Sequence, residues 1–398
     1  MRILLLNQYY PPDTSATAKV AAALAKALSE AHQVTVLAGR PSYDPATCHP
    51  FYLWRRERQG NLVVERVGST TYHRRSMWGR LANYLSYLVL AMLRALTIRA
   101  DLIVAMTDPP VCGIAGAVVA WLRRLPFVYS IQDLYPDMAL AGGIVKPARW
   151  VERWERLHRW ALRRAARVRV LGEDVRERII AKGVEAERVV IIRDGTRIPE
   201  SLPAANHPVV QEIRSGFRFV ILHAGNIGFS GAWETLLQAA RLLENEGVGF
   251  VFVGDGARRP QIEAAATGCR AIRFLPFRPP EEVPYVLAAG DLQVITLRHG
   301  LEGVVVPSKM YPVLAAGRPV LAVTPLGSEV ARIVARHECG LIANPDDPAA
   351  VAAAIREARN DPAQLIAMGQ RAREVAREFE VTGQLRLFRQ LVEEVTES

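Results

Sequence analysis

The chain has 398 residues, of which 50% are hydrophobic and 23% are charged. This length predicts two domains, and the composition excludes the disordered and collagen-like classes. The cysteines Cys48, Cys112, Cys269 and Cys339 lie far apart without metal-ligand spacing. They are therefore expected to be small buried thiols in a reducing compartment rather than a disulfide framework.

Positive charge is concentrated in the first half of the chain. The formal net charge is +10, and residues 1–200 hold 30 Lys and Arg against 18 Asp and Glu. That half therefore carries +12, and the remainder carries 10 − 12 = −2. An excess of this kind predicts an anionic ligand or surface, with nucleic acid and an anionic membrane leaflet as the candidates.

The first half alternates short apolar runs with segments of helical spacing, such as 18–29 and 111–123. Strand and helix repeated in this way predict a parallel sheet with helices on both faces. The expected strands are 2–7, 33–38, 62–67, 101–106, 127–131, 168–171 and 189–192. Met1–Leu6 is too short for an export signal, and no run of about 18 uncharged apolar residues occurs, so we expect a cytoplasmic protein.

A polar, proline-rich stretch at 199–208 predicts a linker, after which the alternation resumes. The expected strands of the second half are 217–223, 249–253, 271–275, 292–296, 319–323 and 340–342. The tail after Pro362 is expected to be helical, with 381–395 as its last helix.

These patterns predict an α/β protein with two doubly wound, Rossmann-like domains, residues 1–200 and 206–378. Residues 379–398 are expected to form a helix that crosses back to the first domain. Ligands of such sheets bind at the carboxyl ends of the strands, here expected to face a cleft between the domains.

The first strand is not followed by a dinucleotide-binding pattern. A nicotinamide enzyme needs G-x-G-x-x-G there, and no glycine lies between Asn7 and Asp13. In the second half, Gly225-Asn226-Ile227-Gly228 forms a glycine-rich turn between a strand and a helix, where a phosphate can approach the backbone. A plain tight turn is the alternative.

The segment from Glu302 to Pro319 carries the strongest chemical signal. It predicts a turn and then a short helix from about Ser308, which we expect to be the N-cap. The free amides of a first helical turn favour an anion, and Lys309 adds a full positive charge there. The segment therefore indicates a diphosphate site, the alternative being an ordinary capped helix with a surface lysine.

Five stretches recur together in one protein family: Gln8-Tyr9-Tyr10-Pro11-Pro12, Val34-Thr35-Val36-Leu37-Ala38-Gly39, Asp133-Leu134-Tyr135-Pro136-Asp137, His223-Ala224-Gly225-Asn226-Ile227-Gly228 and Pro307-Ser308-Lys309. Over nearly its whole length the chain resembles the family 4 retaining glycosyltransferases, which have the GT-B fold. It is similar to transferases of bacterial exopolysaccharide, O-antigen and colanic acid synthesis, whose acceptors are usually lipid-linked.

The resemblance implies a nucleotide-sugar donor, with uridine as the expected base. The implied donor-binding residues are Gly225, Asn226, Gly228, Glu302, Ser308 and Lys309, with Phe277 and Arg278 near the base. Lys309 is also an implied catalytic group. Asp133, after the fifth strand, is expected to orient the acceptor hydroxyl or take up its proton, with Asp137 as its support. A helix cap is the alternative for Asp133.

Two departures from the family pattern weaken the usual donor contacts. The family carries paired glutamates, but counting back from Gly317 places Val304 and Pro312 at those positions. The family's Arg and Lys after the first strand of the second domain are also missing. The diphosphate is therefore expected to rely on Lys309, Ser308 and nearby amides. No Asp-x-Asp lies among the candidate residues, so neither a metal nor another cofactor is expected.

Two basic stretches of the first half also carry apolar faces. Residues 74–80 lead into the uncharged run Leu81–Leu93, and 149–169 hold Trp150, Trp154 and Trp160 among arginines. Such faces fit helices lying in an anionic membrane interface, and the alternative is a core helix with solvated arginines. Nucleic acid is not favoured, because no recognition motif is present.

The sequence therefore predicts a retaining, metal-independent glycosyltransferase, peripheral on the inner face of the membrane. It is expected to transfer a hexosyl or N-acetylaminosugar unit from a UDP-sugar to a polyprenyl-linked or saccharide acceptor in surface polysaccharide synthesis. A nucleotide-sugar epimerase of the same architecture and a non-catalytic membrane adaptor with this fold are the alternatives.

Overall fold

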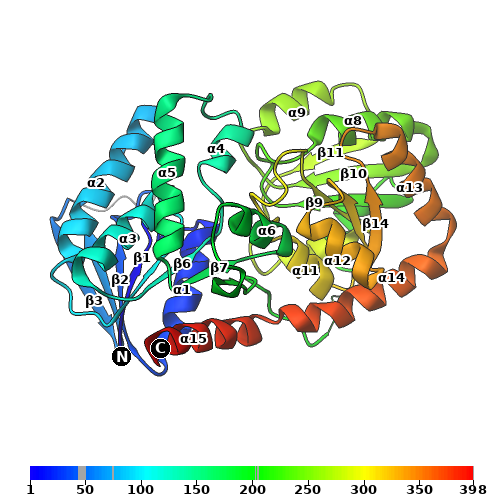
Figure 1. The fold of residues 1–398 in the computed structure, drawn as a ribbon. Coiled ribbons are helices and arrows are strands. Elements are labelled where there is room, and N and C mark those ends of the chain that lie inside the picture. The colour runs from blue at the N-terminus through cyan, green and yellow to red at the C-terminus, as the bar shows by residue number, and fades with distance from the viewer. Residues whose placement is uncertain (44–50, 74–75, 202, 204–205, 398) are drawn as a thin grey trace. The chain divides into compact units, whose positions relative to one another are not determined.

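The computed structural model describes residues 1–397 apart from 44–50, 74–75, 202 and 204–205. The chain divides into two compact units (Figure 1). The first contains Met1–Arg193 and Gln384–Ser398, and the second contains Asp194–Gly383. The division precedes the proline-rich stretch that the sequence predicts as the linker.

The first unit is built on an eight-stranded sheet in the order β3-β4-β2-β1-β5-β6-β7-β8. Its strands are β1 (Arg2–Leu6), β2 (Gln33–Ala38), β3 (Trp54–Gln59), β4 (Leu62–Val67), β5 (Leu102–Ala105), β6 (Phe127–Ser130), β7 (Arg167–Val170) and β8 (Val189–Ile191). All run parallel except the edge strand β3, which pairs antiparallel with β4. The sequence predicts every strand but β3, whose charged run lacks apolar alternation.

Helices cover both faces of this sheet (Figure 1). Its helices are α1 (Ala16–Ser29), α2 (Met77–Ala95), α3 (Cys112–Arg123), α4 (Asp137–Ala141), α5 (Arg149–Arg164), α6 (Glu173–Ala181) and the 3-10 helix η2 (Ala186–Arg188). Helix α1 and the end of α15 (Val381–Glu397) pack on one face, where Ile3 and Leu5 point. Helices α2, α3 and α5 lie side by side on the other face.

The second unit is built on a six-stranded parallel sheet in the order β11-β10-β9-β12-β13-β14. Its strands are β9 (Phe219–Ala224), β10 (Val248–Val253), β11 (Ile272–Leu275), β12 (Leu292–Thr296), β13 (Val320–Val323) and β14 (Gly340–Ala343). The chain moves outward from β9 to β11 and then returns to the other side of β9. The strand order therefore reverses between β9 and β12, which is where such sheets bind ligands.

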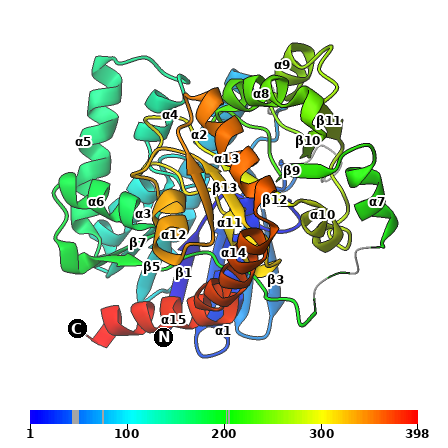
Figure 2. The same cartoon turned by 90° about the vertical axis from the view of Figure 1, so that its right-hand side faces the viewer.

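Alternate residues of these strands enter separate apolar layers, with Ile221 on one face and Val220 on the other. One face is covered by α8, α9 and α13 and the other by α7, α10, α11, α12 and α14 (Figure 2). The helices are α7 (Pro208–Arg214), α8 (Trp233–Leu242), η3 (Glu244–Glu246), α9 (Arg259–Ala265), α10 (Val283–Ala289), α11 (Met310–Ala315), α12 (Glu329–His337), α13 (Pro348–Asn360), α14 (Pro362–Val375) and η4 (Ala376–Phe379).

Three cysteines carry free thiols. Cys112 and Cys339 are buried and Cys269 is half-buried, which agrees with their prediction as small thiols. Burial raises the pKa of Cys339 to about 11, so its thiol stays protonated at neutral pH. Cys48 lies outside the described residues.

Helix α3 approaches the sheet so closely that Gly113 has no room for a side chain. A Cβ there would lie 2.0 Å from Cζ of Tyr129, whose ring is buried in the layer between α3 and β6. Helix propensity alone predicts that Gly113→Ala stabilises the protein by about 1 kcal/mol. Because overpacking costs about 1–3 kcal/mol, we expect the free energy of unfolding to fall by about 1 kcal/mol instead.

Denaturant unfolding decides the sign of this change. Gly327→Ala is the matched control, since no heavy atom lies within 4 Å of a Cβ built there. A stabilised Gly113→Ala protein would contradict the packing of α3 against β6.

Candidate functional site

The glycine-rich turn after β9 is packed against the next loop of the same sheet edge. Gly225 has φ +132, and its amide donates to the Val253 carbonyl at 2.9 Å. A Cβ on Gly254 would lie only 1.9 Å from the Gly225 carbonyl oxygen. Two backbones therefore touch here, and only glycine permits the contact. This turn is a close-packed part of the strand-end surface rather than an ordinary surface turn.

The remainder of this turn is held by Asn226 and Trp233. The Asn226 side chain is wedged so tightly that a Cβ on Gly228 would lie 2.8 Å from its Nδ2, and one on Gly256 2.6 Å from its Oδ1. The Trp233 indole at the start of α8 donates to the Gly228 carbonyl at 2.7 Å. The turn therefore has a fixed shape before any ligand arrives.

Lys309 lies across this turn. A Cβ on Gly225 would be 3.8 Å from Cε and from Nζ of Lys309. Its Nζ is 3.0 Å from Nε2 and 3.4 Å from Nδ1 of His223, the buried fifth residue of β9. The His223 ring meets the Trp233 ring edge-on with centroids 4.8 Å apart. Lys309 follows β12, so the two strands flanking the reversal of strand order supply this pair.

Burial sets the protonation of both groups. It lowers the pKa of Lys309 to about 7, and no carboxylate among the described residues opposes that effect. Burial, and then the Lys309 charge, lower the pKa of His223 well below its usual value. At neutral pH the imidazole is neutral and the lysine is divided between its two forms. An anion arriving beside Lys309 therefore stabilises the charged ammonium.

The turn that leads into α11 differs from the prediction. The helix begins at Met310, and the N-cap position falls on Lys309 with no side-chain cap hydrogen bond. The expectation that Ser308 is the N-cap is therefore wrong. The amides of Met310 and Tyr311 donate to the carbonyls of Pro307 and Ser308 at 3.2 and 3.3 Å, which makes the entry a tight turn instead. The amides of Ser308 and Lys309 have no acceptor among the residues that the structure describes.

The positions of the family's paired glutamates are apolar or blocked. Val304 is fully buried, and Pro312 lies within α11. Glu302 lies in the loop between β12 and α11 and is half-buried. Lys309 places a cationic side chain against the Gly225 turn, and its role in donor binding stays a prediction.

Phe277 and Arg278 follow β11, two strands from β9 on the same edge of the sheet. The Phe277 side chain is exposed. The Arg278 guanidinium is held by Glu212 at 2.5 Å and by Glu282 at 3.7 Å. The Arg278 side chain is therefore occupied by ion pairs within the protein. The predicted contacts with the base use backbone groups, and these ion pairs do not affect them.

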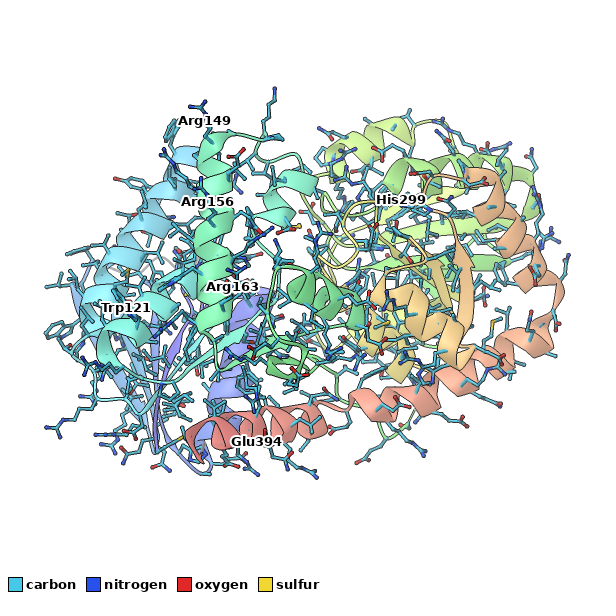
Figure 3. All side chains as sticks on the ribbon, viewed as in Figure 1. Trp121, Arg149, Arg156, Arg163, His299 and Glu394 are labelled. Atoms are coloured by element: carbon cyan, nitrogen blue, oxygen red, sulfur yellow. The ribbon has the colours of Figure 1, made fainter. Side chains whose placement is uncertain are left out.

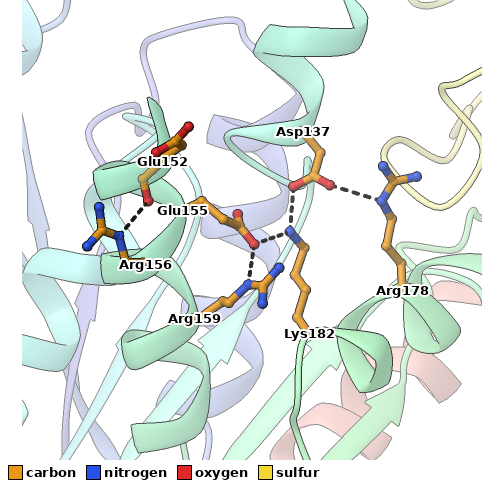
Figure 4. A network of polar contacts seen from close by, with 7 residues as sticks. All are labelled: Asp137, Glu152, Glu155, Arg156, Arg159, Arg178 and Lys182. Carbon is orange, nitrogen blue, oxygen red and sulfur yellow. Dashed lines mark hydrogen bonds and ion pairs between the residues drawn. The ribbon is translucent and has the colours of Figure 1, made fainter. Parts of the chain in front are cut away.

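In the first unit, Asp133 follows β6 and is half-buried. Asp137 begins α4, and its carboxylate binds Lys182 at 2.8 Å and Arg178 at 3.0 Å, while Lys182 also binds Glu155 at 2.8 Å (Figure 4). Burial tends to raise the pKa of Asp137, but Lys182 and Arg178 together lower it below its usual value.

Asp137 is therefore ionised and joins α4 to α6. Its predicted support of Asp133 stays a prediction, since the contacts above are the ones that hold its carboxylate. The structure thus gives this aspartate a structural task in addition to the expected one.

The two predicted membrane faces differ in exposure. On α5, Arg149, Arg156 and Arg163 project from the helix (Figure 3), but Trp154 stacks between Tyr135 and Trp150. On α2, one stripe is exposed along the whole helix: Met77, Trp78, Leu81, Leu85, Val89 and Leu93, continued by Leu96. Arg74 and Arg75 lie outside the described residues.

Helix α2 therefore keeps its apolar face in solvent, whereas α5 packs part of its aromatic face on the protein.

Among the described helices, none is long and apolar enough to cross a membrane. Within the same residues, no three His, Cys, Asp or Glu side chains cluster closely enough to hold a metal ion.

The main feature that sequence reasoning missed is the contact between His223 and Lys309. The signal available was a histidine near the end of an otherwise apolar strand, which is rarely placed there without a polar partner. Its partner is 86 positions away in the chain and is brought near by the strand order.

Comparison with known proteins agrees with this architecture. A model of the glycosyl transferase 4-like domain matches residues 15–195, and a model of the group 1 glycosyl transferases matches residues 218–361. The chain is a family 4-like glycosyltransferase of the GT-B fold. The two matched ranges follow the two compact units of this glycosyltransferase.

Its relatives include the probable glycosyltransferase WbjE of Pseudomonas aeruginosa, 28% identical over 264 residues, 65% of this chain and 66% of WbjE. The alignment thus spans slightly under two thirds of that relative. The putative colanic acid biosynthesis glycosyl transferase WcaI of Escherichia coli is 24% identical over 375 residues, 90% of this chain and 92% of WcaI. HepE from Anabaena, solved in complex with UDP, shares the fold with a TM-score of 0.70 and 19% identity over 100% of both chains.

The half-buried Lys309 of this glycosyltransferase should make stability depend on pH. In the unfolded chain Lys309 titrates near 10.4, so between pH 7 and 10 the unfolded state binds more protons than the folded state. The contribution of Lys309 to the stability of the wild type therefore rises with pH across that window. Lys309→Met removes the group, and we expect the variant to be the more stable protein at pH 6–7, with the difference shrinking toward pH 10.

Thermal unfolding of both proteins at several pH values measures this. Lys146→Met, at an exposed lysine, is the control and should show no such trend. A Lys309→Met difference that stays constant with pH would show that the lysine is not desolvated.

Proposed function

We propose that this glycosyltransferase takes a sugar from a UDP-sugar and adds it to a lipid-linked or saccharide acceptor of a bacterial surface polysaccharide, with retention of the anomeric configuration. The observation that carries the donor assignment is the Lys309 ammonium beside Gly225, at the reversal point of the second sheet. HepE binds UDP and UDP-glucose in its solved structures, and WcaI is named for colanic acid biosynthesis, which supports this substrate class.

The donor side of the reaction requires a group that stabilises the leaving diphosphate. As the bond between the anomeric carbon and the diphosphate oxygen breaks, negative charge grows on that oxygen. Lys309 supplies a positive charge there, and the amides of Ser308 and Lys309 have no acceptor among the described residues. Because Val304 and Pro312 replace the family's carboxylates, Lys309 carries more of this task. The proposal requires no metal.

The acceptor side is assigned to the first unit, where Asp133 orients the acceptor hydroxyl or takes up its proton. Burial and then the charge of Asp133 raise the pKa of Tyr135 well above its usual value. The Tyr135 phenol therefore stays neutral beside the Asp133 carboxylate.

Replacement of Lys309 by Ala should lower turnover by about 100- to 1,000-fold, the usual effect of removing one group that stabilises a developing charge. The measurement is UDP release from UDP-sugars with and without a lipid-linked acceptor. Lys146→Ala should retain full activity.

The same assay separates the alternatives. An epimerase changes the donor without an acceptor and without releasing UDP. An adaptor does neither, although it retains the fold. Near wild-type turnover of Lys309→Ala would remove Lys309 from the donor site.

The proposal also places the first unit on an anionic membrane surface, where lipid-linked acceptors lie. The supporting observation is the exposed apolar stripe of α2, from Met77 to Leu96. A helix with a long apolar face and flanking arginines binds in the interfacial region through buried apolar area and attraction to anionic lipid.

Substitution of Val89 by Asp, in the middle of this stripe, should weaken binding to anionic vesicles about 10-fold or more. Burial of one valine side chain contributes about 1.5–3 kcal/mol, and the variant loses it. Co-sedimentation at low salt gives the affinity. The control is Leu387→Asp, at an exposed leucine on α15, which packs on the opposite face of the sheet. Equal binding by wild type and Val89→Asp would rule out the α2 face.

A further inference from the structure

A hollow of about 420 Å³ lies in the first unit at the edge where the parallel strands begin. The residues around it include the start of β1, β2 and β4, the end of β3 and the last turn of α2. Five arginines line it: Arg2, Arg56, Arg58, Arg94 and Arg99. Substrate sites of such sheets lie at the opposite edge, where the strands end. The hollow is therefore separate from the site around Asp133.

The carboxylates of this region do not balance the arginines. Glu65 binds Arg94 at 2.7 Å and Arg56 at 3.5 Å. Asp101 binds Arg2 at 2.5 Å. Among the described residues, these five guanidinium groups and two carboxylates give the region a net charge of 5 − 2 = +3.

Two of these cations have no carboxylate partner in the part of the chain that the structure describes. The Arg58 Nε donates to the Gly60 carbonyl at 3.0 Å, which does not neutralise it. Arg99 is exposed at the mouth of the hollow. Guanidinium groups present paired N–H donors that match the oxygens of a phosphate, and several together hold one strongly.

Apolar side chains are neighbours of the lining residues near the end of α2. Leu93 precedes Arg94 and Leu96 precedes Thr97 of the lining, and the two exposed leucines end the apolar stripe of that helix. Trp54 of β3 is 66% exposed, and the Arg94 guanidinium lies 5.3 Å from the centre of its ring. A soluble phosphate would use the arginines and leave these side chains in water. A phospholipid would contact both groups of side chains. Its phosphate headgroup would bind the arginines, and its acyl chains would contact the apolar side chains.

From this arrangement we infer that the hollow binds the phosphate headgroup of an anionic phospholipid while the apolar face of α2 lies in the bilayer. This inference rests on the proposed membrane association and adds a specific site to it. The stripe of α2 covers about 28 Å, the length of a 19-residue helix, and the hollow holds the headgroup at its carboxyl end.

The test compares vesicles of phosphatidylcholine with vesicles that also contain phosphatidylglycerol. The double variant Arg58→Gln/Arg99→Gln removes the two unpaired cations, both of which are exposed, so folding should be kept. Each basic residue near an anionic surface contributes about 1 kcal/mol, and losing two should weaken binding to the anionic vesicles roughly 30-fold. Binding to phosphatidylcholine alone should not change.

The matched control is Lys26→Gln/Arg386→Gln, which removes the same charge from exposed positions of α1 and α15 on the other face of the sheet. It should change binding less than about 3-fold. If this control loses as much affinity as the hollow variant, or if the hollow variant binds like wild type, the headgroup site is overturned. If Val89→Asp also binds like wild type, the membrane association itself fails.

Glycerol phosphate separates the lipid from a soluble ligand. We expect millimolar glycerol phosphate to displace the protein from anionic vesicles only weakly, because it offers nothing to Trp54, Leu93 and Leu96. Saturable binding of glycerol phosphate to the free protein at micromolar concentration, lost in Arg58→Gln/Arg99→Gln, would assign the hollow to a soluble phosphate and overturn the lipid assignment.

Discussion

The donor-side site depends on the reversal of strand order between β9 and β12. Because the sheet grows outward from β9 in both directions, the loops after these two neighbouring strands leave toward opposite faces of the sheet. His223 is the last residue but one of β9 and Lys309 follows β12, and their side chains lie 3.0 Å apart. Packing removes part of the water around Lys309, and the described residues supply no carboxylate there, so its charge becomes available to a ligand rather than to the protein.

The shape of the turn after β9 is set by close backbone contacts and by the Asn226 side chain. Gly225 and Gly254 touch through their main chains, and Asn226 fills the space that side chains at Gly228 and Gly256 would need. A rigid cradle of this kind holds a ligand without reorganising. The paired glutamates of the family are replaced by Val304 and Pro312, so the specificity that those carboxylates give must come from elsewhere. The charge that the proposed donor site offers a diphosphate is then concentrated on Lys309, whose protonation responds to what it binds.

In the first unit, the balance of positive and negative side chains differs between the two edges of the sheet. Beyond the strand ends, Asp137 is balanced by Lys182 and Arg178, and the network serves to join helices. At the strand starts, arginines outnumber carboxylates, and the exposed face of α2 leads into them. A buried carboxylate left without a partner would be costly, whereas exposed arginines are hydrated and can remain unpaired until an anion replaces the water. Part of the surplus positive charge of this half is thus exposed to solvent at the strand starts.

Local pattern was enough to predict most of the architecture. Strands such as Gln33–Ala38 and Leu292–Thr296 follow from apolar runs that a doubly covered sheet must bury, and the turn at Gly225 and the cation at Lys309 follow from residue type and spacing. The sequence did not predict β3, because its charged residues form a strand only through pairing with β4. Ser308 is not the N-cap, because the chain enters α11 through a tight turn. The contact of His223 with Lys309 and the choice of α2 over α5 as the exposed face were decided only by the tertiary structure. Both depend on which elements become neighbours in the fold. Strand order and helix packing are properties of the whole chain, and the hydrophobic periodicity of a single segment does not determine them.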